Sequence, residues 1–400
     1  MMTKKLFENN SLLQSCTATV LSCLEAKEGF LVELDQTVFF PEGGGQLSDR
    51  GTLGGVAVTH VSEKEGHIYH HCTAALPVGE QVEAKLNWQL RLDRMQQHLG
   101  EHLLSYACWR LFQANNVGFH MNEDTVTIDL DKELTQEQLL KAELYTNEII
   151  WENRPVTISY LDSSEAAKLQ GQMRKFNNKL TGILRLVAVE NADICTCCGT
   201  HPPFTGMVGT VKLIRWEKHK QGQRLEFLCG RRALLDADKK NGLVLQAAAS
   251  LSAKPEQLVE RLEKLKEESQ IQLNDLRGKL AALQGKLLLQ QAATAPVNKD
   301  GVKIVSLALE NADGKDLKAL LPVAMELENS LVLLLGIMPE RISYVAVLGK
   351  NTAADCRQAM KALNEAFRGR GGGKVECAQG GSGYCSDWPT KLAMVEQRIC

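Results

Sequence analysis

Several features that would assign this chain to a common class are missing from its 400 residues. No stretch of about 18 or more apolar residues occurs, so the sequence predicts no transmembrane helix. The opening Met-Met-Thr-Lys-Lys leads into no clean signal peptide, and we expect none. The net charge of −2 offers no general positive field that would draw the chain onto nucleic acid. Any nucleic-acid binding must therefore depend on local patches.

Three common motifs are also absent. There is no Walker loop, no Gly-x-Gly-x-x-Gly opening a βαβ unit, and no His-Glu-x-x-His of the kind found in zinc peptidases. Aromatic residues are scarce at 5%, and the 12 cysteines are scattered along the chain with no disulfide framework. Such cysteines are typical of free thiols or metal ligands in a reducing compartment, so we expect a cytoplasmic protein without a membrane partner.

The pattern of hydrophobic and polar residues divides the chain into four parts, and its overall class is α+β. Residues 1–90 carry short alternating runs between turn signals, which predict a small antiparallel β-barrel. Residues 91–245 mix helical and strand patterns and predict an α+β domain. Residues 246–295 predict a coiled-coil helical arm, and residues 296–400 alternate strand and helix, which predicts a separate α/β domain.

The helical arm is predicted from the spacing of its leucines. Between Leu258 and Leu287 they recur in steps of 3 and 4, except that Ser269 fills the middle of the gap between Leu265 and Leu273. The resulting 11-residue stretch from Leu262 to Leu273 is typical of a stutter in a heptad. This pattern indicates either an arm between domains or the seam of a homodimer. Further on, Arg368–Gly373 is predicted as a Gly-rich loop, which either meets phosphates or is a flexible connector.

Two pairs of residues indicate a metal site. His98 and His102 lie four residues apart in a helix predicted over residues 88 to about 104, so both imidazoles face the same side. Cys197 and His201 lie across a short turn that contains glycine. Two histidines from a rigid helix, with a thiolate and an imidazole from a loop, form a ligand set that suits zinc.

Neighbouring features admit more than one interpretation. Glu101 is either a carboxylate that orients His98, a base that assists a zinc-bound water, or an ordinary helix glutamate. Gly43-Gly44-Gly45, followed by Gln46, is either a wide hairpin turn or a loop whose bare backbone admits a nucleotide or an aminoacyl group. The histidines within residues 67–71 fall on both faces of a predicted strand, so we expect them to be packed or exposed without a metal.

Local positive patches are the candidates for nucleic-acid binding. Each has the alternative interpretation of an ordinary solvated face. The patches are Arg91 with Arg94, residues 212–224, Arg231 with Arg232, and Arg368-Gly369-Arg370 with Lys374.

The ordered motifs of this chain resemble those of the editing half of alanyl-tRNA synthetase and of its freestanding counterpart, the AlaX family of alanyl-tRNA editing proteins, long type. The motifs are Thr37–Gln46 with Asp49 and Gly51, His98 with His102, Cys197 with His201, Cys229–Leu234, Gly371–Gly373 and Ala378–Gly381. The last two resemble the C-terminal domain of the same synthetases, so the resemblance extends over nearly the whole chain.

The resemblance implies a zinc centre, a substrate and a set of contacts. Cys197 has the family's Cys-x-x-x-His spacing to His201, which favours it over the competing thiols of Cys195 and Cys198. The implied substrate is tRNA(Ala) mischarged with serine or glycine, with Thr37 contacting the serine hydroxyl. The implied zinc ligands are His98, His102, Cys197 and His201, the implied cleft residues are Gly43, Gly44, Gly45 and Gln46, and the candidate tRNA contacts are Arg231, Arg232, Arg370 and Lys374.

Three expectations complete this interpretation. The 97 residues before His98 leave no room for an aminoacylation domain, so we expect ester hydrolysis without charging of tRNA. Catalytic zinc usually keeps three protein ligands, so we expect that His201 binds weakly or that a five-coordinate state forms with substrate. The alternatives are a zinc-stabilised RNA-binding module without catalysis, a metallopeptidase, which the absent His-Glu-x-x-His disfavours, and a coiled-coil scaffold, which leaves the motifs unexplained.

Overall fold

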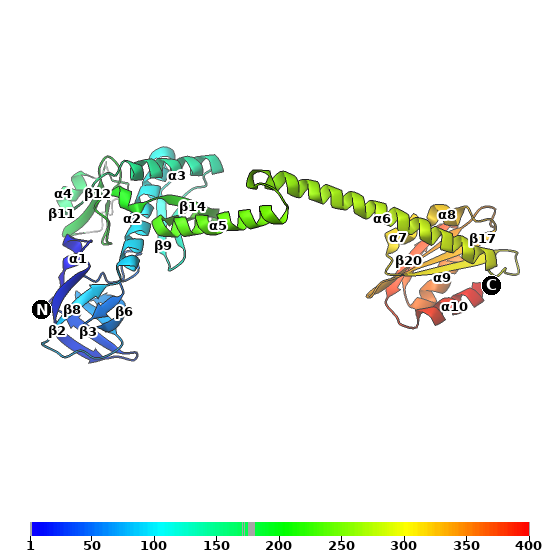
Figure 1. The fold of residues 1–400 in the computed structure, drawn as a ribbon, viewed down its shortest axis with the longest axis horizontal. Helices are drawn as coiled ribbons and strands as arrows, with labels where there is room; N and C mark the ends of the chain where they lie inside the picture. Colours follow the sequence, from blue (N-terminus) through cyan, green and yellow to red (C-terminus); the bar gives the residue numbers. More distant parts are fainter. Residues whose placement is uncertain (1, 170, 172, 175–180, 400) are drawn as a thin grey trace. The chain divides into compact units, whose positions relative to one another are not determined.

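The computed structural model describes residues 2–169, 171, 173–174 and 181–399. They form two compact units, Met1–Gln246 and Ala247–Cys400, whose ribbons are drawn in Figure 1. Helices and several sheets alternate in both, which confirms the predicted mixed α+β class. Within the described ranges, no helix combines the length and the hydropathy needed to cross a membrane.

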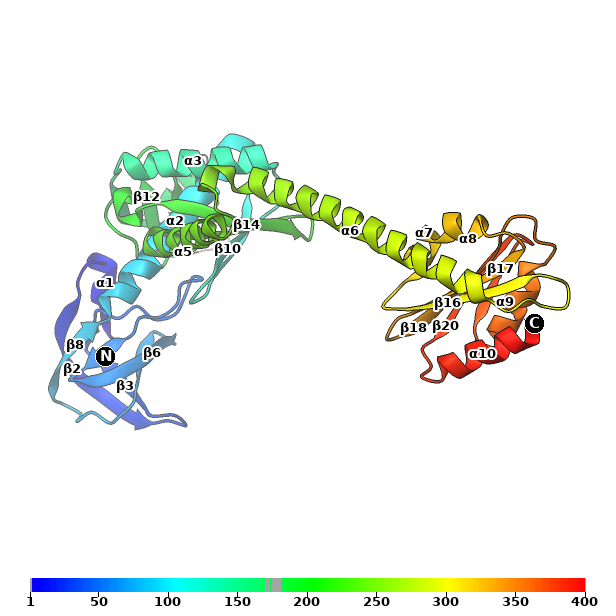
Figure 2. The ribbon, with the colours of Figure 1, turned by 45° about the vertical axis from the view of Figure 1, so that its right-hand side comes forward.

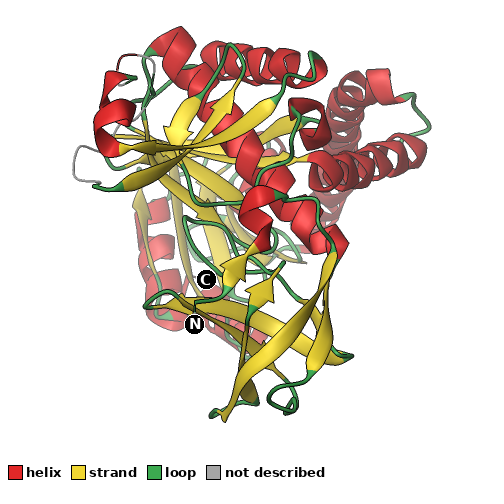
Figure 3. Ribbon diagram, turned by 90° about the vertical axis from the view of Figure 1, so that its left-hand side faces the viewer, coloured by secondary structure: helices red, strands yellow, loops and turns green. Residues whose placement is uncertain are grey.

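Six antiparallel strands near the start of the first unit close into a barrel, whose yellow strands lie at the bottom of Figure 3. Alternate side chains of these strands point inward, because successive residues of a strand face opposite sides. The interior is apolar and includes Val32, Leu34 and Ile68. In spatial order the strands are β2 (Ser15–Glu25), β3 (Phe30–Leu34), β7 (His67–Cys72), β6 (Val56–Lys64), β5 (Gly51–Leu53) and β8 (Gln81–Leu86).

A short segment precedes the barrel and covers part of it. β1 (Lys4–Lys5) pairs in parallel with β4 (Gln36–Thr37), and the one-turn helix α1 (Leu6–Asn9) follows β1. Phe7 of α1 packs edge-on against Phe40, with ring centroids 5.5 Å apart. This contact brings the N-terminal residues next to the segment that carries the glycine-rich motif.

Helix α2 (Trp88–Phe112) is the long central helix of the first unit. It begins at Trp88, as the periodicity predicts, because the Asn87 side chain caps it by accepting a hydrogen bond from the Leu90 amide. It continues beyond the predicted end near Leu104 and stops where Gln113 adopts a left-handed conformation. Most of its residues from 94 to 108 are buried, so its middle section lies inside the unit.

Two small sheets surround α2. One has the order β14-β15-β10-β9 and shares a core with α2 and α3, and the other has the order β11-β12-β13. Helix α3 (Gln136–Trp151) starts at the predicted capping box of Thr135 and Gln138. The strands and remaining short helices are β9 (Asn116–Met121), β10 (Val126–Leu130), β11 (Val156–Asp162), α4 (Ser163–Lys168), β12 (Ile183–Val189), β13 (Ile194–Thr196), η2 (Thr205–Val208), β14 (Val211–His219) and β15 (Gly222–Cys229).

Arg91 and Arg94, considered above as an RNA-binding patch, are buried and therefore do not form one. The guanidinium of Arg91 forms an ion pair with Asp49 and donates to the carbonyls of Ser11 and Val38. Arg94 donates to the carbonyl of Ser48. These arginines join α2 to the segment after the glycine-rich turn, because the buried carboxylate and carbonyls there need donors.

The second unit is built around one mixed sheet with the order β16-β17-β18-β20-β19. Figure 2 shows α7 and α8 on one face of this sheet and α9 and α10 on the other, in agreement with the two separate apolar cores there. Its elements are η3 (Pro255–Gln257), α6 (Leu258–Thr294), β16 (Lys303–Glu310), α7 (Gly314–Ala319), α8 (Leu321–Met325), β17 (Ser330–Ile337), β18 (Arg341–Leu348), α9 (Cys356–Phe367), β19 (Arg370–Gly373), β20 (Cys377–Gly383) and α10 (Trp388–Ile399).

Of two helical segments, the sequence predicted one and missed the other. Helix α5 (Gly230–Ser250) was not predicted from the Cys229–Leu234 motif. Helix α6 occupies the predicted arm, and its end packs on the sheet through Leu288 and Ala292. Most heptad leucines of α6, Leu262 and Leu276 among them, are exposed, and the coiled coil stays a prediction.

The predicted Gly-rich loop at 368–373 is wrong from residue 370 onward. Residues 370–373 form β19, which pairs with β20 along its whole length. A Cβ at Gly371 would lie 2.4 Å from the Cα of Gly380, so glycine permits a close approach of the two backbones. The glycines therefore serve strand packing at the sheet edge.

Replacing Arg91 by alanine will destabilise the first unit strongly. The change leaves the carboxylate of Asp49 buried without its charged partner, and breaking such a pair typically costs about 3–5 kcal/mol. The measurement is denaturant unfolding followed by tryptophan fluorescence. The control is Arg215→Ala, whose ion pairs are mostly exposed, with an expected loss below about 1 kcal/mol. Equal losses in the two variants would contradict this account of the buried pair.

Candidate metal centre

Four side chains from two distant segments converge inside the first unit. The middle of α2 supplies His98 and His102, and the loop after β13 supplies Cys197 and His201. One donor atom from each lies within 4.8 Å of the others, and three of the four residues are buried. The structure thus brings together all four residues that the sequence indicated as metal ligands.

The distances between the donors fit a tetrahedral ion. Cys197 Sγ lies 3.3 Å from His98 Nε2 and 3.8 Å from His201 Nε2. The Nε2 atoms of His102 and His201 are 3.3 Å apart. A zinc ion with ligands at about 2.0–2.3 Å would hold neighbouring donors about 3.3–3.6 Å apart. The residues present therefore fit a four-coordinate metal site.

Gln46 fixes the orientation of the first histidine. Its Oε1 accepts hydrogen bonds from His98 Nδ1 at 2.7 Å and from the Thr200 amide at 3.0 Å. Its Nε2 donates to Thr200 Oγ1 at 2.8 Å. Because His98 donates through Nδ1, its Nε2 keeps a lone pair that faces Cys197. Gln46 thus bonds to one of the four candidate ligands, and it is buried and not at the border of the cleft, where we expected it.

Glycines make this arrangement sterically possible. Gly43 and Gln46 exchange both backbone hydrogen bonds, and Gly44 and Gly45 have positive φ, so the motif is a tight turn. A Cβ at Gly199 would lie 2.2 Å from the ring of His98. Glycine at 199 therefore lets the Cys/His loop approach α2 closely enough for the four donors to meet.

His102 is held by an acidic partner. Its Nδ1 lies 3.3 Å from Asp193 Oδ2 and 3.2 Å from Cys195 Sγ. Burial alone would raise the pKa of Asp193, but Arg174 and His102 lower it, so this buried carboxylate stays ionised. A carboxylate on Nδ1 fixes the tautomer that leaves Nε2 free to bind a metal.

The three cysteines near the site differ in their chemistry. Burial raises the pKa of Cys195 to about 11, which keeps that thiol protonated. Burial also opposes ionisation of Cys197, but His98 and His201 hold the pKa of its thiol well below the usual range. Cys198 is exposed. Because the thiolate is the form that binds metals, Cys197 is the best sulfur ligand of the three. Cys195 belongs to a second group with His102 and Asp193 that could also hold an ion.

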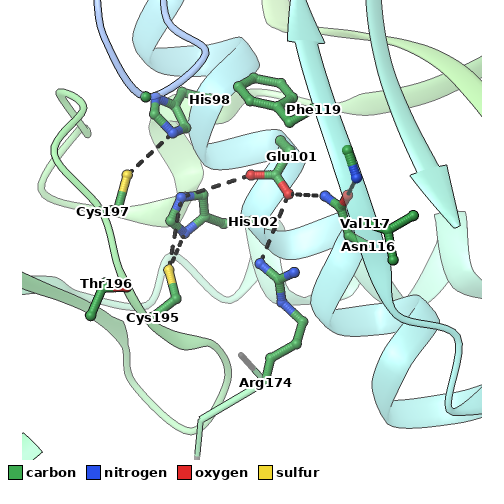
Figure 4. A pocket seen from close by; sticks show the side chains of 12 residues that line it. His98, Glu101, His102, Asn116, Val117, Phe119, Arg174, Cys195, Thr196 and Cys197 are labelled. Carbon is green, nitrogen blue, oxygen red and sulfur yellow. Dashed lines mark hydrogen bonds and ion pairs between the residues drawn. The ribbon is translucent and has the colours of Figure 1, made fainter. Parts of the chain in front are cut away.

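A cavity of about 400 Å³ opens beside the cluster. Figure 4 shows His98 directed at Cys197 and His102 at Cys195, with the β9 residues Asn116, Val117 and Phe119 on the other side of the histidines. Phe119 of β9 lies over the His98 ring, with centroids 5.4 Å apart. The cavity is large enough for a small amino acid next to the metal position.

Glu101 lines this cavity and points at His102, which corrects the interpretation that it orients His98. Its Oε1 accepts hydrogen bonds from Ser105 at 2.7 Å and from Asn116 at 2.6 Å. Its Oε2 lies 3.8 Å from His102 Nε2, and Arg174 approaches Oε1 at 3.8 Å. One carboxylate oxygen is thus anchored, while the other faces the metal position.

Thr37 lies elsewhere than expected. It is fully buried, its Oγ1 bonds to His70 Nε2 at 2.8 Å, and it is not among the described residues that line the cavity. Burial lowers the pKa of His70 to about 4, and its ring packs edge-on against Phe39. The histidine is therefore neutral and packed in the barrel. Of the glycine-rich turn, only Gly44 is among those lining residues.

The four candidate tRNA contacts have different surroundings. Arg232 is held by Asp93, with Nη2 2.6 Å from Oδ2, and donates to the carbonyl of Asn122, so it serves the fold. Arg231 is exposed. Arg370 and Lys374, at the start and just after the end of β19, are exposed in the second unit.

Four residues of the site were not identified from sequence. Asp193 and Arg174 support His102, and Asn116 with Ser105 anchors Glu101. Asp193 precedes the Cys motif closely, which was a usable signal. Asn116 and Arg174 reach the site through tertiary structure alone, so no local pattern marks them.

Comparison with known proteins shows which proteins this chain resembles. A family described as "Threonyl and Alanyl tRNA synthetase second additional domain" matches residues 184–226, which include the Cys/His loop. The chain is 30% identical over 399 residues to the alanyl-tRNA editing protein AlaX-L of Pyrococcus horikoshii, covering 95% of this chain and 94% of that protein. It is 31% identical to the alanyl-tRNA editing protein Aarsd1 of Bos taurus, covering 67% of this chain and 64% of that protein.

Longer and partial relatives were also found. The alanine–tRNA ligase of Pyrococcus abyssi is 30% identical over 94% of this chain, which corresponds to 42% of the ligase. The solved C-Ala domain of alanyl-tRNA synthetase from Aquifex aeolicus matches 26% of this chain and 93% of that domain at 16% identity, with a TM-score of 0.24, which is too low to support an argument about the fold. The similarity to AlaX-L over nearly the full length of both proteins decides the family: this chain belongs to the AlaX family of alanyl-tRNA editing proteins.

Proposed function

We propose that this protein is a trans-editing hydrolase that releases serine, and on grounds of size glycine, from mischarged tRNA(Ala). The observation that carries the proposal is the convergence of His98, His102, Cys197 and His201 beside a cavity that Glu101 also lines. The names of the relatives support the class of substrate. We propose zinc as the ion, because three imidazoles and one thiolate at tetrahedral spacing suit it.

A zinc ion bound to these residues would lower the pKa of a water and polarise the ester carbonyl of an aminoacyl-tRNA. The protein's part is to position the groups that move protons. Glu101 Oε1 is anchored by Ser105 and Asn116, so Oε2 faces the cavity and can accept a proton from a water there. Phe119 and Gly44 line the same space.

We also propose that the second unit contacts the phosphates of the tRNA. A cavity of about 440 Å³ there is lined by Lys315, Lys318 and Arg341, none of which has an ion-pair partner among the described residues. Among the described residues, Asp313 is the one carboxylate that lines it, and this carboxylate accepts hydrogen bonds from the amides of Lys315 and Asp316 in α7. In neighbouring strands, Ser343 lies opposite Gly381, and Gly381 lies opposite Arg370. Arg370 is therefore on the same face of the sheet as Ser343, which lines this cavity.

We further propose that the protein forms a homodimer through this unit. The exposed leucines of α6 support self-association through that helix.

One observation favours the alternative of a zinc-stabilised RNA-binding module. Four protein donors surround a single point, and a closed set of four ligands is typical of structural zinc. The cavity next to the cluster and the anchored Glu101 favour catalysis, because a purely structural site needs neither.

Zinc-loaded protein will release serine from Ser-tRNA(Ala) and leave Ala-tRNA(Ala) intact. This selectivity requires a group in the cavity other than Thr37 that bonds the serine hydroxyl, because such a site discriminates against the analogue that lacks one. The His102→Ala variant will lose both zinc and activity, since it removes one of the four donors. The measurements are release of labelled amino acid and zinc content. Zinc bound by the wild type without hydrolysis of either ester would make the metal structural and favour the RNA-binding module.

The Glu101→Gln variant will retain zinc while kcat falls by about 100-fold or more, the usual contribution of a general base. Glutamine preserves the shape of the side chain but cannot accept the proton. Steady-state hydrolysis and zinc content provide the measurement, with Glu148→Gln on the exposed side of α3 as the matched control. If Glu101→Gln lost its zinc, the residue would have a structural role.

A double variant with Arg341→Ala and Arg370→Ala will bind tRNA more weakly. Each lost phosphate contact lowers the slope of log affinity against log salt by about 1. The measurement is a filter-binding titration over a range of salt concentrations. Arg357→Ala is the control, because Arg357 is paired with Asp355. Unchanged affinity and slope in the double variant would rule out this surface.

A further inference from the structure

His201 differs from the other two histidines of the cluster in how its ring is held. The Nδ1 atoms of His98 and His102 have side-chain acceptors in Gln46 and Asp193, at 2.7 Å and 3.3 Å. The Nδ1 atom of His201 is buried and has no hydrogen-bond partner among the described residues. Metal-bound histidines nearly always donate through their second nitrogen, and loss of that partner typically weakens metal binding by about 10–100-fold.

The backbone around His201 is nevertheless fixed. The amide of Thr200 donates to Gln46 Oε1 at 3.0 Å, and Ser11 Oγ donates to the carbonyl of His201 at 2.6 Å. Pro202 and Pro203 follow and restrict the chain. At this position the backbone of the loop is therefore fixed, whereas the imidazole ring is less restrained.

A separate cavity lies next to His201. It has a volume of about 250 Å³, and His201 lines it together with residues that include Asn10, Val156, Ile158 and Pro202. His201 is not among the described residues that line the larger cavity beside Glu101. A rotation of the His201 ring about its side-chain bonds would break no hydrogen bond at Nδ1, whereas the rings of His98 and His102 each have a partner there.

We propose that His201 is the exchangeable member of the four-residue ligand set. His98, His102 and Cys197 form the permanent part, and His201 leaves the fourth position when the site needs an open one. The inference rests on the proposed zinc-dependent hydrolysis, and it explains how four convergent donors serve a reaction for which three are usual. His201 has the role of a positioning residue in this account.

The first test ranks the ligands by zinc affinity in the full-length protein, measured by competition with a chelator. His98→Ala and His102→Ala will each lose at least tenfold more affinity than His201→Ala, because they remove anchored ligands. An equal or larger loss in His201→Ala overturns the proposal. Melting curves of the metal-free variants serve as the folding control.

The second test needs no variant of uncertain stability. In zinc-loaded wild-type protein labelled with ¹⁵N-histidine, the ring signals of His98 and His102 will be sharp, while that of His201 will be broadened by exchange. Three equally sharp signals would overturn the proposal. Neither test involves turnover. Failure of the proposed function would instead appear as an absence of serine release from the zinc-loaded protein, so the two failures can be told apart.

Discussion

The site depends on the side-chain amide of Gln46, which joins three segments that are far apart in the chain. Its oxygen accepts from His98 and from the amide of Thr200, and its nitrogen donates to the Thr200 hydroxyl. The glycine turn of the barrel, helix α2 and the Cys/His loop are thereby held at one point. The arrangement sets the tautomer of His98 and brings Cys197 to within 3.3 Å of its free nitrogen.

Burial makes this junction rigid and also decides its chemistry. The ion pair of Arg91 with Asp49 lies in the same interface between the barrel segment and α2, so the two histidines project from a fixed helix. Next to His102, the carboxylate of Asp193 stays ionised inside the unit, because Arg174 and His102 lower its pKa. Charges that would be costly alone are tolerated because each has a partner, and they leave one thiolate, Cys197, available to a metal.

Local patterns in the sequence were sufficient for the parts of the site that lie on one element. The four-residue spacing of His98 and His102 placed both on one face of a helix, and the spacing of Cys197 and His201 indicated the other pair. Partners brought in by tertiary structure carried no such signal. Asn116 reaches Glu101 from a strand, and the burial of Arg94 could not be read from its charge. The strand β19 was mistaken for a loop, because its glycines fit a strand only when β20 packs beside it.

The central claim is that three imidazoles and one thiolate bind one zinc ion. X-ray absorption at the zinc edge of the purified, full-length protein tests it most directly. The account predicts one sulfur at about 2.3 Å and nitrogen ligands at about 2.0–2.1 Å, with three imidazoles in the resting protein. Two sulfur ligands would show that Cys195 joins Cys197 in the site. A shell of oxygen ligands alone would contradict the claim that this cluster holds the metal.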